Sequence, residues 1–163
     1  MITEYKQFLT PEECATLIGL GESGSLNAGK TQGSILGYRK AKVRWFDDHP
    51  LVERIKSEIA KLSEIPIDKQ ESFHFVKYEP KGEYKPHYDG AHRSKTALIY
   101  LNTGFKGGET QFPRIKRTIE PEVGKLIIWD NIKSNGSNDP ESFHAGLPVE
   151  FGTKYIAVIW IKK

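Results

Sequence analysis

From Ser72 onward the chain alternates short β-rich segments with Gly, Pro and Asn, and this punctuation constrains its fold more than any other feature. Segments of this length suit strands, and the turn residues between them favour short connections. Many short strands joined in this way are typical of an antiparallel sandwich or barrel such as a jelly roll. The expected strands cover residues 72–79, 84–89, 95–102, 109–112, 125–130, 143–148 and 153–161.

Two helices are expected before this β-rich region. The stretch Thr10-Pro11-Glu12-Glu13 has a capping hydroxyl, a proline at the first helical position and a glutamate three residues after the cap, so it predicts a helix that ends at Gly21. A second helix begins at Pro50, carries apolar residues at helical spacing and stops before Pro66. Both helices are expected to support one sheet.

The length and composition predict one domain, covering residues 1–163. Cys14 is the only cysteine, which excludes an internal disulfide and fits a reducing compartment. The chain starts without the basic and apolar leader of a secreted protein, and its longest apolar runs are of strand length. We therefore expect a cytoplasmic protein without membrane contact. A net charge of +3 does not demand an acidic partner, so no nucleic acid is expected.

His87 and Asp89 are candidate metal ligands, because residues two apart on a strand share a face. His144 is the best third ligand, since it can return from a different strand. Two histidines and one carboxylate leave other coordination positions open, as in non-haem Fe(II) oxygenases. The pair alone is weak evidence, because a lone histidine on a strand is more often a surface or hydrogen-bonded residue.

Arg39 alternates with Ala41, Val43 and Trp45, so strand periodicity points it toward the interior or a cleft. Lys40, Lys42 and Arg44 fall on the opposite, solvated face. A snorkelling or ion-paired arginine is the alternative for Arg39.

Lys154 shares a strand face with the apolar residues Ile156, Val158 and Trp160. A hairpin with its turn near Glu150 would set Lys154 opposite Gly146, close to His144. A buried lysine needs an anionic partner, and the far carboxylate of a dicarboxylate cosubstrate would serve. A snorkelling surface lysine is equally compatible with this position.

Tyr100 ends an inward row that begins with Thr96 and Leu98. Its hydroxyl needs a polar partner, which is either the backbone or the same carboxylate that Lys154 would hold. Residues 21–37 and 131–141 are rich in Gly, Ser and Asn, and we expect them to be loops. If the metal site exists, loops of this length are reasonable substrate lids.

The order of motifs resembles the prolyl 4-hydroxylase-like branch of the 2-oxoglutarate and Fe(II)-dependent dioxygenases over nearly the whole chain. The motifs that carry this resemblance are Phe8 to Cys14 with Leu17-Ile18, Arg39 to Phe46, Tyr78 with Gly82, Tyr84, His87 and Asp89, Tyr100 to Asn102 with Gly107 to Thr110 and Phe112-Pro113, and His144 to Gly146 with Pro148-Val149, Gly152, Lys154 and Trp160-Ile161.

The resemblance implies a double-stranded β-helix that couples decarboxylation of 2-oxoglutarate to hydroxylation of a carbon–hydrogen bond. It implies that His87, Asp89 and His144 hold Fe(II), with 2-oxoglutarate, O2 and ascorbate as the expected cofactors. It further implies that Lys154 pairs with the C5 carboxylate of 2-oxoglutarate. It also implies that the cosubstrate pocket contains Tyr100, Tyr78 and Thr110. Two residues would face the substrate, Arg39 and Trp160.

The expected substrate is a protein or peptide that contains proline. Another amino-acid side chain or a small molecule is the alternative within the oxygenases. A cupin-like metal-binding module, or a hydrolase with zinc in the same triad, is the alternative from another class. His49, His74 and His92 match no ligand position of the family and are treated as ordinary residues.

Overall fold

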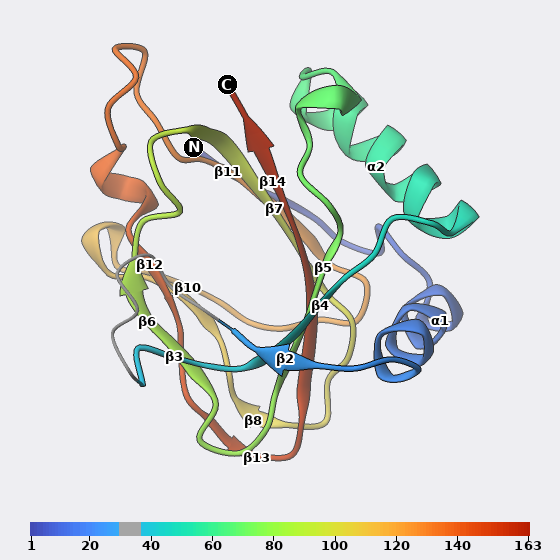
Figure 1. The fold of residues 1–163 in the computed structure, drawn as a ribbon. Helices are drawn as coiled ribbons and strands as arrows, with labels where there is room; N and C mark the ends of the chain where they lie inside the picture. Colours follow the sequence, from blue (N-terminus) through green and yellow to red (C-terminus); the bar gives the residue numbers. More distant parts are fainter. Residues whose placement is uncertain (30–36) are drawn as a thin grey trace.

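Two antiparallel sheets face each other in the computed structural model, which describes residues 1–29 and 37–163 (Figure 1). Within this part of the chain, the larger sheet has the order β1-β11-β7-β14-β5-β4-β2 and the smaller one β10-β9-β12-β6-β3, while β13 and β8 form a separate pair. The strands of the larger sheet are β1 (Ile2–Tyr5), β2 (Asn27–Ala28), β4 (Lys42–Trp45), β5 (His74–Tyr78), β7 (Arg93–Tyr100), β11 (Leu126–Asp130) and β14 (Lys154–Lys162). The other strands are β3 (Arg39–Lys40), β6 (Glu83–His87), β8 (Lys106–Gly107), β9 (Thr110–Phe112), β10 (Arg117–Ile119), β12 (His144–Gly146) and β13 (Val149–Phe151).

The central strand β14 shows why the chain forms two layers. Its alternate residues Ile156, Val158 and Trp160 pack between the two sheets, as the periodicity predicts. Ala157, Ile159 and Ile161 pack on the other face, in the core beneath the helices. A strand that is apolar on both faces must be covered on both faces, so β14 requires the helices as well as the smaller sheet.

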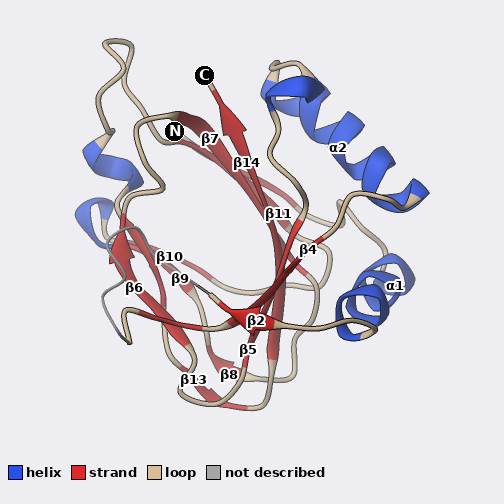
Figure 2. Ribbon diagram, viewed as in Figure 1, coloured by secondary structure: helices blue, strands red, loops and turns tan. Residues whose placement is uncertain are grey.

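The helices α1 (Pro11–Glu22) and α2 (Pro50–Ser63) cover the outer face of the larger sheet (Figure 2). The expected capping box is present in α1, because Thr10 Oγ1 accepts from Glu13 N at 3.1 Å and Glu13 Oε1 accepts from Thr10 N at 3.0 Å. His49 caps α2 through Nδ1. Neither helix of the described chain is long and apolar enough to cross a membrane.

The strand predictions differ from the structure mainly at boundaries. The expected strand 84–89 ends at His87, because Gly90 adopts a φ of +100° and turns the chain away. Five strands of the described chain were not predicted. They have two to four residues each and lie at sheet edges: β1, β2, β8, β10 and β13. Three 3-10 turns complete the described elements: η1 (Ile67–Lys69), η2 (Pro113–Ile115) and η3 (Pro140–Ser142).

The two segments predicted as loops fare differently. The first, residues 21–37, contains the end of α1 and the strand β2, while its residues 30–36 lie outside the described part of the chain. The second, residues 131–141, is a loop closed by a bridge between Ile132 and Asn138 and leads into η3. A role for either segment as a lid stays a prediction.

Candidate metal centre

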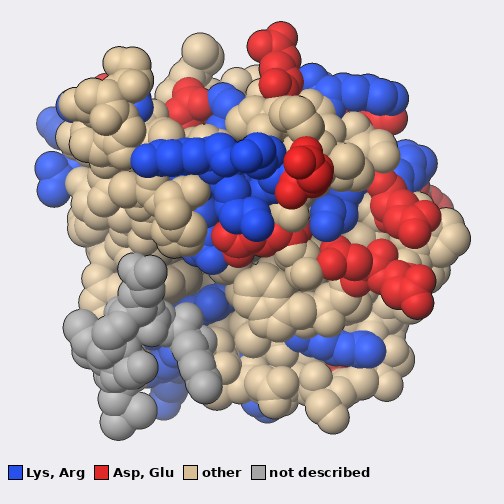
Figure 3. Space-filling view, turned by 45° about the horizontal axis from the view of Figure 1, so that its top comes forward, with Lys and Arg blue, Asp and Glu red and all other residues tan. Residues whose placement is uncertain are grey.

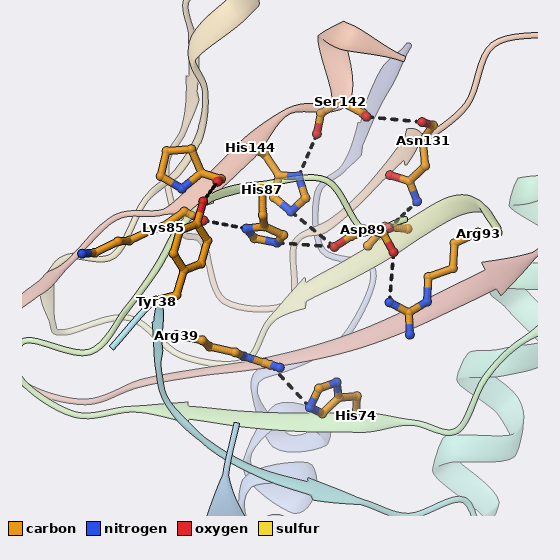
Figure 4. Close-up of polar contacts among 12 residues, drawn as sticks. Tyr38, Arg39, His74, Lys85, His87, Asp89, Arg93, Asn131, Ser142 and His144 are labelled. Carbon is orange, nitrogen blue, oxygen red and sulfur yellow. Dashed lines mark hydrogen bonds and ion pairs between the residues drawn. The ribbon is translucent and has the colours of Figure 1, made fainter. Parts of the chain in front are cut away.

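His87, Asp89 and His144 converge at one end of the space between the sheets. His144 opens β12 and lies directly opposite His87, the last residue of β6, so its arrival on a different strand is confirmed. Asp89 Oδ1 lies 3.4 Å from His87 Nε2 and 3.8 Å from His144 Nε2 (Figure 4). Asp89 lies after the end of β6, so the prediction that His87 and Asp89 share a strand face is wrong. The prediction that their side chains lie close together is confirmed. The ligand atoms all lie within 4.8 Å of one another, which is close enough to hold a metal ion.

Both imidazole rings are oriented by backbone carbonyls. His87 Nδ1 donates to Lys85 O at 2.7 Å, and His144 Nδ1 donates to Ser142 O at 2.8 Å. Because the proton is on Nδ1, each Nε2 presents a lone pair toward Asp89, the tautomer that metal ligation requires. Burial lowers the pKa of His144 to about 4, so this ring is neutral at physiological pH. The residues present therefore fit a divalent metal of the transition series.

The Asp89 carboxylate is ionised in spite of its burial. Burial alone would raise its pKa, but the facing His144 and His87 rings and a hydrogen bond from Thr96 bring the pKa well below its ordinary value. Thr96 Oγ1 lies 2.6 Å from Asp89 Oδ2, on the side of the carboxylate away from the histidines. Asp89 therefore places a negative charge beside the Nε2 atoms of both histidines.

Aromatic rings fix the two histidines from behind. Tyr84 stacks on His87 with ring centroids 3.5 Å apart and an interplanar angle of 16°. Trp129 meets His144 edge to face, with centroids 4.8 Å apart. These contacts restrict both rings to one orientation without using their Nε2 atoms.

Lys154 lies in the same cavity and is 2% exposed, so the surface-lysine alternative is wrong. The predicted hairpin is also wrong, because β13 pairs with β8 and Lys154 pairs with Tyr78 of β5 in the larger sheet. Lys154 nevertheless lies close to Gly146, as predicted, because the two residues face each other from different sheets. A Cβ atom added to Gly146 would lie 3.9 Å from the Nζ atom of Lys154.

The Lys154 ammonium is surrounded by aromatic and hydroxyl groups. Its Nζ lies 4.8 Å from the ring centroid of Tyr78 and 5.9 Å from that of Tyr100. Burial lowers the pKa of Lys154 to about 7, and Glu109 opposes this shift. The hydroxyls of Tyr100 and Thr110 lie 2.5 Å apart, and the backbone of Thr110 also hydrogen-bonds to Tyr100. Such a site can bind a carboxylate, which would return the ammonium to its charged form.

A wider groove opens from this cavity and receives Arg39 and Trp160. Arg39 is half-buried, with its guanidinium carbon 4.8 Å from the Tyr84 ring centroid and one nitrogen 3.5 Å from His74 Nε2. The cleft interpretation of Arg39 therefore holds. Trp160 stacks beneath Arg93, with the guanidinium carbon 3.9 Å from the Trp160 ring centroid.

The groove is also lined by residues for which the sequence predicted no site role, among them Trp45, His74, His92 and Arg93. His74 had been treated as ordinary, yet its ring is stacked under Trp45 with centroids 3.8 Å apart. Burial, Arg39 and Arg93 together lower the pKa of His74 to about 2, so it is neutral. The inward periodicity of β5, which places His74 on the face of Tyr78, could have revealed it.

The face of the molecule seen in Figure 3 carries lysine and arginine side chains in a band, with acidic side chains beside them. Arg93 illustrates this pairing, because its Nε and Nη2 each donate to Glu71 at 2.8 Å. Arg93, which lines the groove, is therefore paired with an acidic side chain.

Comparison with known proteins gives consistent results. Residues 73–162 match the family described as the 2OG-Fe(II) oxygenase superfamily. Prolyl 4-hydroxylase 1 of Arabidopsis thaliana is 28% identical over 188 residues, which cover 96% of this chain and 66% of the plant protein. A viral collagen prolyl hydroxylase from Paramecium bursaria Chlorella virus-1, solved as its 2OG complex, superposes with a TM-score of 0.82 at 28% identity over 99% of this chain and 95% of that one. A Pseudomonas putida prolyl-4-hydroxylase shares the fold, with a TM-score of 0.77 at 20% identity over 99% and 92% of the two chains. The expected double-stranded β-helix is thereby confirmed.

Proposed function

We propose that this chain, which belongs to the 2OG-Fe(II) oxygenase superfamily, hydroxylates proline residues of a protein or peptide with 2-oxoglutarate as its cosubstrate. The observation that carries the proposal is that a fully buried lysine, Lys154, shares one cavity with His87, Asp89 and His144. A site that binds only a metal ion has no use for a buried lysine. A dicarboxylate, in contrast, can bind the metal at one end and the lysine ammonium at the other.

Fe(II) would be held by Nε2 of His87, by the Asp89 carboxylate and by Nε2 of His144. Bound iron and 2-oxoglutarate supply the oxidising chemistry, in which dioxygen is consumed, 2-oxoglutarate is decarboxylated to succinate and the substrate gains a hydroxyl group. The bonds from Nδ1 to Lys85 O and Ser142 O hold both rings with Nε2 toward Asp89. It also surrounds the site with aromatic rings, which exclude water from the reacting atoms.

The C5 carboxylate of 2-oxoglutarate would pair with the Lys154 ammonium at the inner end of the cavity. The hydroxyl pair of Tyr100 and Thr110 is the second donor, and the Tyr78 ring forms one wall. Charge pairing in this dry site fixes the cosubstrate in one orientation relative to the metal ligands.

The substrate would approach along the groove that contains Arg39 and Trp160. The likeness to the viral protein, whose name is a collagen prolyl hydroxylase, supports proline as the target. We further propose that residues 1–163 act as one catalytic domain. A requirement for ascorbate and a cytoplasmic location stay predictions.

The test is to incubate the protein with Fe(II), 2-oxoglutarate and a panel of proline-rich peptides, and to measure both succinate and peptide mass. We expect succinate release together with a peptide heavier by one oxygen atom. Asp89→Ala should abolish both while the fold is retained. His49→Asn is the matched control, because it alters a histidine outside the site and keeps a capping side chain on α2.

Two other outcomes would redirect the assignment. If 2-oxoglutarate is bound but no peptide stimulates succinate release, the target is another side chain or a small molecule. If the protein neither binds nor decarboxylates 2-oxoglutarate, the zinc hydrolase or the cupin-like module remains. The burial of Lys154 weighs against both of these, because neither requires an anchor for a dicarboxylate.

A further inference from the structure

A chain of buried hydrogen bonds lies behind the Asp89 carboxylate. Asn131, the residue after β11, lies near Asp89 (Figure 4). Asn131 donates from Nδ2 to Thr96 Oγ1 at 2.8 Å, and Thr96 Oγ1 lies 2.6 Å from Asp89 Oδ2. Thr96 and Asn131 are each 1% exposed. Thr96 lies in β7 and Asn131 directly follows β11, so these hydrogen bonds link the larger sheet to the candidate metal centre.

The direction of these hydrogen bonds is determined by proton counting. A threonine hydroxyl has one proton to donate. If the Asn131 amide were reversed, Thr96 would donate to the amide oxygen, and two acceptors would then face each other across 2.6 Å at Asp89. With Nδ2 toward Thr96, the hydroxyl accepts from Asn131 and its proton goes to Asp89 Oδ2. The amide of Asn131 thus directs the Thr96 proton.

The consequence for Asp89 is that its two oxygens are no longer equivalent. Oδ2 is occupied by the Thr96 hydroxyl, whereas Oδ1 faces Nε2 of both histidines. A carboxylate in free rotation could offer either oxygen, or both, to a metal ion.

The backbone of Asn131 is held in place on both sides. Its N donates to Ser94 O at 2.8 Å, and its O accepts from Asp139 N at 2.8 Å. The Ser142 hydroxyl, which donates to Asp139 O at 2.7 Å, lies 3.4 Å from the Asn131 carbonyl oxygen. Ser142 is also the residue whose carbonyl orients His144. The same backbone therefore holds the supports of Asp89 and of His144.

The side-chain amide of Asn131 lowers the stability of the fold if its role is only structural. Among the described residues, its Oδ1 is buried without a hydrogen-bond partner. Leaving a buried acceptor unsatisfied costs about 1–3 kcal/mol, which an apolar side chain of the same shape would not. A group retained at such a cost beside a candidate metal centre points to a role in that centre.

We propose that Asn131 is a positioning residue for the metal centre, which acts through Thr96 to present Asp89 Oδ1 alone as the metal ligand. The proposal rests on the assignment of His87, Asp89 and His144 as ligands. By engaging Oδ2, the Asn131 and Thr96 pair keeps Asp89 from binding through both oxygens and so preserves an open coordination position.

The test measures binding of Co(II), without 2-oxoglutarate or peptide, by titration and by the visible absorption spectrum of the bound ion. Asn131→Leu and Thr96→Val should each weaken Co(II) binding about 10–100-fold and change the spectrum, as substitutions behind metal ligands do. Thr96→Ser keeps the hydroxyl and should retain both the wild-type Co(II) affinity and the wild-type spectrum. In the Thr96→Val background, Asn131→Leu should add little further loss, because its effect passes through the hydroxyl.

Asn102→Leu is the matched control for loss of a structural asparagine. Its side chain donates to Thr153 O at 2.8 Å and accepts from Tyr155 N at 2.8 Å, so its replacement should lower stability but leave Co(II) affinity unchanged. Wild-type affinity and spectrum in Asn131→Leu would overturn the proposal. If Asn131→Leu does not fold, unchanged binding by Thr96→Val overturns it instead. Failure of the wild-type protein to bind Co(II) would overturn the ligand assignment itself.

Discussion

In the function proposed above, recognition of 2-oxoglutarate depends on the residue Lys154. It begins β14, it is 2% exposed and burial lowers its pKa to about 7. An amine in this state is poised between charge and neutrality, so a bound carboxylate determines which form prevails.

Replacing Lys154 by methionine should weaken 2-oxoglutarate binding about thirtyfold or more, because loss of one partner from a buried charge pair costs at least about 2 kcal/mol. The measurement is the dissociation constant of 2-oxoglutarate. Lys125→Met is the control: Lys125 is also buried, at 3% exposed, but pairs with Glu4 and Glu122. Equal losses in the two variants would mean that Lys154 has no special relation to 2-oxoglutarate.

The lowered pKa of Lys154 predicts proton uptake on binding. Above pH 7 the free protein holds mostly the neutral amine, whereas the bound carboxylate favours the ammonium. At pH 8, calorimetry in two buffers of different ionisation enthalpy should show uptake approaching one proton per 2-oxoglutarate, and affinity should fall as pH rises further. Lys154→Arg, which stays charged, should show no such uptake. Identical proton uptake in both proteins would assign it elsewhere.

At the level of elements, the turn before β11 depends on Gly124. Gly124 has a φ of +75°, and a Cβ added there would lie 2.0 Å from Leu9 O. Leu9 N donates to Gly124 O at 3.1 Å, so this turn joins the segment before α1 to the larger sheet.

Gly124→Ala should therefore lower the free energy of unfolding by more than about 1 kcal/mol, since it combines a left-handed conformation with a backbone clash. Gly19→Ala is the opposite case, because Gly19 lies inside α1 with nothing within 4 Å of an added Cβ. This change should raise stability by about 0.5–1 kcal/mol. Urea unfolding measures both, and a stabilising Gly124→Ala would contradict the turn geometry.

The elements were more predictable than the connections between them. The capping box of Thr10 and Glu13 is local, so the start of α1 could be predicted. The strand that pairs with Lys154 could not be predicted. Closeness in sequence favours a hairpin with the preceding strand, whereas the jelly-roll connection places β14 in the other sheet, between β5 and β7. Asn131 and Thr96 lie 35 positions apart, and nothing in the sequence indicates that they meet.

On the scale of the whole molecule, the candidate metal centre joins the two sheets. His87 and His144 belong to the smaller sheet, whereas Asp89 is hydrogen-bonded to Thr96 of the larger one. A metal bound only by the native arrangement must stabilise that arrangement.

Metal and 2-oxoglutarate at a hundredfold excess over their dissociation constants should each stabilise the native state by about 2.7 kcal/mol. For the metal alone this corresponds to a rise in Tm of roughly 5–10 °C. Thermal unfolding with and without Mn(II) measures it, and EDTA should reverse it. His144→Ala should show no rise, and a rise as large as that of the wild-type protein would exclude His144 as a ligand.

Because backbone carbonyl groups orient the two histidine rings, the residues that supply these carbonyls can be substituted without loss of the hydrogen bond. His87 takes its tautomer from the main chain of Lys85 and not from a side chain, so substitution at position 85 leaves the acceptor in place. Thr96 acts through its own hydroxyl and has no such freedom. Across related chains we therefore expect position 85 to vary widely, and position 96 to be confined to residues that carry a hydroxyl.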